Sequence, residues 1–66
     1  MIPNHLRQVR EDRLISATEL ARKAGISALT ISRIEKGESC RQQTKRKILA
    51  ALGISPFDRE KVFPEN

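Results

Sequence analysis

The chain has 66 residues, of which 38% are apolar, and 13 Lys and Arg against 8 Asp and Glu give a net charge of +5. This length predicts one small domain over residues 1–66, and the charge favours a polyanionic partner, nucleic acid before an acidic membrane, over a basic surface that only aids solubility. A single cysteine, Cys40, excludes an internal disulfide scaffold, and no apolar run is long enough to span a membrane, so we expect a cytoplasmic protein without a membrane partner.

The hydrophobic residues follow helical spacing throughout, and strand-like alternation is absent from the sequence. Pro3 and Asn4 offer a start for a first helix. Leu6 and Val9 then form one buried stripe, which continues through about Asp12.

Two short helices are predicted next, within "ISATELARKAGISALTISRIEKG", residues 15–37. Ser16 opens an S-x-x-E capping box that closes at Glu19, and Gly25 supplies the left-handed residue that stops the helix. Ser27 caps the second helix, which ends at Gly37. Their inward-facing residues are predicted to be Leu20, Ala21, Ala24, Ile31 and Ile34.

A loop from Glu38 to about Gln43 is expected before a fourth helix from Thr44 to Leu52, which Gly53 stops. The residues that this helix buries are predicted to be Ile48, Ala51 and Leu52.

A fifth helix is indicated by "SPFD", residues 55–58, because Ser is a good N-cap and Pro suits the first helical position. This short helix is expected to carry Phe57, Val62 and Phe63 and to end at Pro64. The predicted fold is therefore all-α, a compact bundle of about five short helices.

Only about three residues, Gly25 to Ser27, separate the two short helices of residues 16–36. Helices of about eight to ten residues are marginal alone, so these two must pack on each other and on the first and fourth helices. Ala21 is small where the second helix must approach the first. This is the layout of a helix-turn-helix, in which the second helix enters a DNA groove.

The same residues resemble a known family. The segments "TISRIEKG", residues 30–37, and "ALGIS", residues 51–55, are similar to those of the phage repressor and Cro (Xre-type) helix-turn-helix proteins, and the likeness runs from about Leu6 to Ser55. The resemblance implies a lambda-repressor-like domain with double-stranded DNA as its partner. It also implies an ion pair between Arg10 and Glu35, which otherwise would be two solvated surface charges.

The face of the second short helix opposite Ile31 and Ile34 is the candidate for reading bases. Its apolar first turn suits the thymine methyl group, while Arg33 can contact guanine, contact a phosphate or lie idle at the surface. Family members often carry Gln at the position of Ala17 and polar residues at positions 28 and 29. The predicted base-reading residues are Ala28, Leu29, Ser32 and Arg33.

Contacts to the DNA backbone are expected from the segment "CRQQTKRK", residues 40–47, which flanks this helix in the family, unless it is only a solvated polar face. Thr18 and the N–H groups at the start of its helix can hold a further phosphate. The predicted backbone-contacting residues are Thr18, Lys36, Arg41, Gln42, Gln43, Lys45 and Arg46.

These features predict a sequence-specific DNA-binding transcriptional regulator of the phage repressor and Cro type, acting as a homodimer on a two-fold operator. Phe57, Val62 and Phe63 could supply the dimer contact or could close the monomer core. The alternative is an antitoxin or adaptor that uses the same fold mainly to bind a protein, such as a toxin or another regulator. An enzyme is not expected, nor a cofactor or a metal site, because the chain has one His, one Cys and no metal-ligand cluster.

Overall fold

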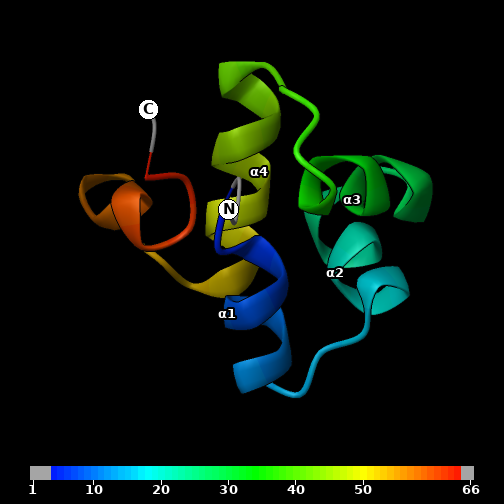
Figure 1. Cartoon of the computed structure of the whole chain (residues 1–66). Helices are drawn as coiled ribbons and strands as arrows, with labels where there is room; N and C mark the ends of the chain where they lie inside the picture. Colours follow the sequence, from blue (N-terminus) through cyan, green and yellow to red (C-terminus); the bar gives the residue numbers. More distant parts are fainter. Residues whose placement is uncertain (1–3, 65–66) are drawn as a thin grey trace.

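The computed structural model describes residues 4–64, which form four α-helices and one 3₁₀ helix without a strand. The helices are α1 (Leu6–Asp12), α2 (Ala17–Ala24), α3 (Ala28–Glu35) and α4 (Gln42–Leu52), followed by the 3₁₀ helix η1 (Pro56–Lys61). The molecule measures 24 × 23 × 23 Å along its three principal axes (Figure 1). The predicted all-α bundle of five short helices is confirmed.

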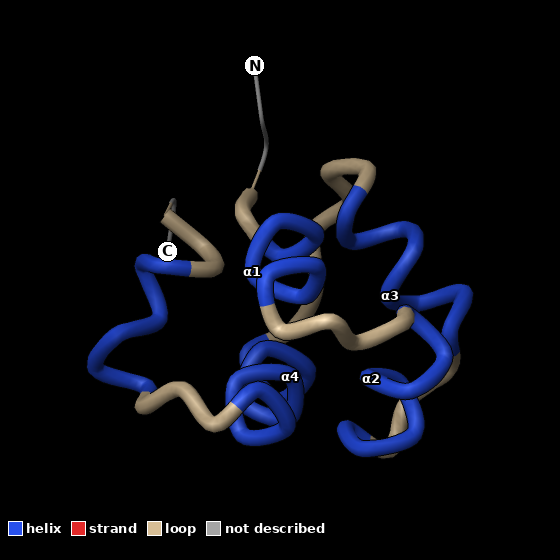
Figure 2. Tube along the Cα trace, turned by 90° about the horizontal axis from the view of Figure 1, so that it is seen from below, coloured by secondary structure: helices blue, strands red, loops and turns tan. Residues whose placement is uncertain are grey.

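The longest helix, α4, runs through the middle of the fold (Figures 1 and 2). Helices α2 and α3 lie on one side of α4, and η1 lies on the other. Helix α2 contacts both α3 and α4, and α3 also contacts α1, so the helix-turn-helix is attached to the rest of the molecule through both of its helices.

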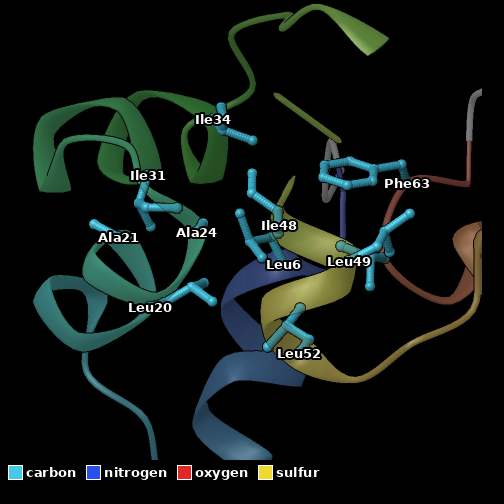
Figure 3. Packing of buried hydrophobic residues seen from close by; sticks show 11 residues of the cluster. Leu6, Leu20, Ala21, Ala24, Ile31, Ile34, Ile48, Leu49, Leu52 and Phe63 are labelled. Atoms are coloured by element: carbon cyan, nitrogen blue, oxygen red, sulfur yellow. The ribbon is translucent and has the colours of Figure 1, made fainter. Parts of the chain in front are cut away.

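The core is formed almost entirely by aliphatic side chains, which converge between the helices (Figure 3). The side chains that are fully excluded from solvent are Leu6, Leu20, Ile31, Ile48 and Val62. All four α-helices and the segment after η1 therefore contribute to one apolar cluster, which is the main source of stability for helices too short to persist alone.

Serine caps start both helices of the helix-turn-helix, as predicted. The Ser16 hydroxyl accepts a hydrogen bond from the Glu19 amide at 3.0 Å, and the Ser27 hydroxyl accepts one from the Thr30 amide at 3.1 Å. Gly25 ends α2 with a φ of 73°, and the Ile26 amide then donates to the Ala21 carbonyl at 2.9 Å. These local bonds make the turn between α2 and α3 tight.

The start of α4 differs from the prediction. The helix begins at Gln42 rather than Thr44, because Arg41 is extended and its carbonyl accepts the first helical bond from the Lys45 amide at 3.0 Å. Gln42 and Gln43 therefore lie in the first helical turn and not in the loop. No side chain caps this helix.

The C-terminal segment also differs. The predicted fifth helix is a 3₁₀ helix that ends at Lys61, so Val62 and Phe63 follow it rather than belong to it. Both of these residues are buried, whereas Phe57 is 93% exposed. The His5 amide donates to the Val62 carbonyl at 2.8 Å and thereby ties this segment to the start of α1.

Two smaller corrections concern the core and the chain start. Leu49 is buried although it was not among the residues predicted to be buried, whereas Ala51, which was, is only half-buried. Pro3, predicted to start the first helix, lies outside the described residues. Asn4, predicted with it, does lie at this start, since its side-chain oxygen accepts a hydrogen bond from the Leu6 amide at 3.0 Å.

Candidate nucleic-acid interface

Helix α3 has one buried side and one exposed side. Ile31 and Ile34 are 0% and 2% exposed, which fixes that side of the helix against the core. On the opposite side Leu29 is 58% exposed, and Arg33 and Lys36 are also exposed. A stripe of one apolar and two cationic side chains therefore faces outward along the helix.

The other two residues predicted to read bases lie at the edge of this stripe. Ser32 is half-buried, and Ala28 is half-buried and packs against the core cluster. Of the two apolar residues in the first turn, Leu29 alone carries a large exposed side chain.

An ion pair holds the end of α3 against α1. The Arg10 guanidinium donates from Nε to Glu35 Oε2 at 2.7 Å and from Nη2 to Glu35 Oε1 at 3.2 Å, while its Nη1 donates to the Ile15 carbonyl at 2.9 Å. The two side chains are only 13% and 11% exposed. The hydrogen bond with Glu35 raises the pKa of Arg10, against a smaller opposing effect of burial.

A second link reaches α3 from the segment before α1. The Asn4 side-chain amide donates to the Ile34 carbonyl at 2.7 Å, so one of the last carbonyls of α3 has a partner outside the helix. With the ion pair and the buried isoleucines, this bond fixes the direction in which the exposed stripe points.

The start of α2 leaves Thr18 exposed beside Ala17, which is half-buried. The Ser16 hydroxyl is bonded to the Glu19 amide. The Thr18 hydroxyl and the first amides of α2 lie at the positive end of the helix dipole.

Two open hollows lie on either side of the start of α4. The first, which we call the α3 hollow, is lined by both Arg33 of α3 and Arg41. Its lining residues are Thr30, Arg33, Ile34, Glu38, Ser39, Cys40, Arg41 and Thr44.

The second, the η1 hollow, lies between α4 and the segment from Pro56 to Phe63. Its lining residues are Gln42, Lys45, Arg46, Leu49, Pro56, Arg59 and Phe63. Four of the seven residues predicted to contact the DNA backbone line a hollow: Arg41 lines the α3 hollow with Arg33, whereas Gln42, Lys45 and Arg46 line the η1 hollow with Arg59. Thr18 and Lys36 line neither hollow. Gln43 lines neither hollow and is exposed on the first turn of α4.

The arrangement in residues 16–36 is that of a helix-turn-helix, with a capped supporting helix, a tight turn and a second helix that is buried on one side and exposed on the other. The sequence model of the helix-turn-helix family of the Cro and C1 type matches residues 6–58. The chain belongs to this family. Its members are DNA-binding regulators.

The comparison with curated proteins gives no match. The family match extends from the first residue of α1 into η1, so it includes both hollows except for Arg59 and Phe63. This helix-turn-helix family is a family of regulators and not of enzymes.

Cys40 lies at the edge of the α3 hollow and packs against the core. Partial burial raises the pKa of its thiol, and the charge of Lys45 offsets part of that rise. The thiol is therefore less readily ionised than that of a solvent-exposed cysteine.

Within residues 4–64, no three His, Cys, Asp or Glu side chains gather in a way that could hold a metal ion. Over the same range, no helix has the length and apolar character needed to cross a membrane.

One of the three cations that line the η1 hollow was not predicted from the sequence as a site residue. Arg59 lies in "DREK", residues 58–61, whose alternating charges are typical of a solvated surface. Its place near Lys45 and Arg46 depends on how η1 folds back onto α4, and no local pattern indicates that contact.

Proposed function

We propose that this protein is a sequence-specific transcriptional regulator of the phage repressor and Cro type, which inserts α3 into the major groove of its operator. The observation that carries the proposal is the exposed stripe of Leu29, Arg33 and Lys36 on a helix whose other side is buried. A helix held this rigidly can present the same side chains to every operator, which sequence reading requires.

The base-reading residues are proposed to be Ala28, Leu29, Ser32 and Arg33. Leu29 is suited to the methyl group of thymine, because it is apolar and exposed in the first turn of α3. Arg33 is suited to the two acceptors on the major-groove edge of guanine, and Ser32 can bond to several bases.

Phosphate contacts are proposed on both sides of α3. Thr18 at the start of α2 serves one side, and the start of α4 serves the other. The proposed set is Thr18, Lys36, Arg41, Gln42, Gln43, Lys45 and Arg46. These contacts supply most of the affinity, and their number determines how strongly binding depends on salt.

A homodimer is proposed because one α3 reads only a few base pairs, and two half-sites about one helical turn apart multiply the specificity. Phe57 is the residue suited to the contact between protomers, since it is 93% exposed whereas Val62 and Phe63 are buried.

The proposal is tested by selecting duplexes from a random library and measuring the affinity for the selected sequence as thymines are replaced one at a time by deoxyuridine. Deoxyuridine lacks only the methyl group. We expect that replacing one particular thymine in each half-site lowers the affinity of the wild type about 3- to 10-fold. The same replacement should leave the affinity of Leu29→Ala unchanged. Selection that yields no preferred sequence would contradict the proposal.

A second function, binding to a protein such as a toxin, could use the exposed apolar side chains of Leu29 and Phe57. The two functions are separated by the selection experiment. An antitoxin or adaptor that does not read DNA gives no preferred duplex, even at low salt.

A further inference from the structure

We propose that the η1 hollow binds one phosphate of the DNA backbone, and that Arg59 is a phosphate-contacting residue together with Lys45 and Arg46. This inference rests on the proposed function, since it assumes that the protein binds duplex DNA. It adds a contact on the side of α4 that faces away from α3 (Figure 1).

The η1 hollow is lined by positive charge. Three of its lining residues are cationic, and among the described residues that line it none is acidic. Asp58 and Glu60 are the immediate neighbours of Arg59 in the chain, yet neither belongs to the lining. Cations that share one small hollow repel each other, and a bound anion relieves that repulsion.

Two of these three cations are held in place by contacts within the protein. The Lys45 ammonium lies over the ring of Phe63, at 5.7 Å from its centroid. The Arg59 guanidinium donates from Nη1 to the Pro56 carbonyl at 3.2 Å, which leaves its other N–H groups for further partners. Since these side chains are already positioned, binding an anion orders them less than it would order freely moving surface residues.

The size and shape of the η1 hollow suit a phosphate group. The hollow has a volume of about 220 Å³, which accommodates a phosphate group with several waters, each of about 30 Å³. Leu49 and Phe63 provide an apolar floor, so the polar groups of the site are concentrated at the rim. Guanidinium groups bind phosphate oxygens in pairs, and the Lys45 ammonium adds a point charge.

The position of the hollow favours the DNA backbone over free phosphate as the source of that group. Gln42, Lys45 and Arg46 lie on the first two turns of α4, directly after the loop that leaves α3. The α3 hollow, with Arg33 and Arg41, borders the same end of α4 on its other side. A backbone that passes the start of α4 can therefore reach both hollows.

The test compares Arg59→Gln with Lys61→Gln in fluorescence titrations on the selected duplex over about 50 to 200 mM salt. Both variants remove one positive charge from η1, but Lys61 does not line the hollow. We expect Arg59→Gln to weaken binding about 5- to 10-fold on every sequence and to reduce the salt slope by about 0.9, with a much smaller effect of Lys61→Gln. Thermal unfolding of both variants shows whether the loss of the Pro56 hydrogen bond has changed the fold, and Arg59→Lys, which keeps the charge, is expected to restore part of the slope.

Equal effects of Arg59→Gln and Lys61→Gln, on a wild type that binds DNA, would overturn this inference and leave the proposed function intact. A wild type that binds no duplex at low salt would overturn both. A titration with inorganic phosphate at constant ionic strength tests free phosphate as the alternative source of the bound group. Shifts of the Arg59 and Lys45 resonances without any effect of Arg59→Gln on DNA affinity would assign the hollow to a free anion and overturn the assignment to DNA.

Discussion

Leu14 is in an unusual conformation for its residue type. Its φ is 56°, and its side chain is 92% exposed. The left-handed region costs a residue with a β-carbon about 1–2 kcal/mol, and the exposed side chain offers little packing in return. The turn between α1 and α2 therefore contains strain that the core must offset.

Leu14→Gly is expected to stabilise the protein by about 0.5–1 kcal/mol, because glycine takes a positive φ without strain, although it also gains freedom in the unfolded chain. For a chain of this length, that corresponds to a melting temperature about 2–8 °C higher in thermal unfolding. The matched control is Leu14→Ala, which keeps the β-carbon and is expected to change little. Destabilisation by both substitutions would show that the leucine side chain makes contacts that matter.

Arg10 and Glu35 form the most enclosed charged contact of the described structure, and their bidentate geometry predicts strong coupling. Glu35→Gln is expected to cost about 2–3 kcal/mol in urea unfolding, since it leaves the guanidinium partly buried without its counter-charge. The double variant Arg10→Met with Glu35→Gln should cost clearly less than the two single variants summed. Simple additivity would refute the coupling.

At the scale of elements, the helices differ in how well their starts could be predicted. Ser16 and Ser27 cap α2 and α3 through bonds to residues three positions away, so the local sequence is sufficient to locate both starts. The start of α4 was misplaced because Arg41 has no capping side chain and therefore gives no local signal. Arg41 instead contributes a charge to the α3 hollow, which Arg33 also lines.

Arg41→Ser is therefore expected to increase stability and weaken DNA binding together. A serine at this extended position can cap α4 and contribute about 0.5–1 kcal/mol in chemical denaturation. The loss of one phosphate contact should reduce affinity about 5-fold on all duplexes and lower the salt slope by about 0.9. Ser27→Ala, which removes an existing cap, is the control for the stability effect. Unchanged DNA affinity of Arg41→Ser would remove Arg41 from the interface.

At the scale of the whole molecule, the sequence was sufficient for the helical class, for the inward faces of α2 and α3, and for the Arg10–Glu35 partnership that the family resemblance implied. It was not sufficient for the C-terminal segment. Phe57 and Phe63 are alike in type, and only the turn after η1, where the Phe63 amide bonds to the Arg59 carbonyl at 2.7 Å, buries one and exposes the other. The η1 hollow depends on the same turn, which explains why Arg59 was missed.

These two aromatic residues should therefore have opposite roles. Phe63→Ala is expected to cost about 3–4 kcal/mol in thermal unfolding, because it opens a cavity beside Ile48 and Leu49 (Figure 3). Phe57→Ala is expected to change stability by less than about 0.5 kcal/mol and to shift sedimentation toward the monomer. A dimer that is unaffected by Phe57→Ala would exclude this residue from the contact between protomers.

The central claim is that α3 reads bases, and the most direct test is the affinity of Arg33→Ala for the selected duplex and for a scrambled one, over about 50 to 200 mM salt. We expect the variant to lose about 5- to 100-fold in affinity for the selected duplex and much less for the scrambled one, so that its preference is relaxed at one position. Arg22→Ala, at the exposed end of α2, is the control for the loss of one positive charge. An equal loss on both duplexes would place Arg33 on a phosphate, and the absence of any binding by the wild type at low salt would contradict the account altogether.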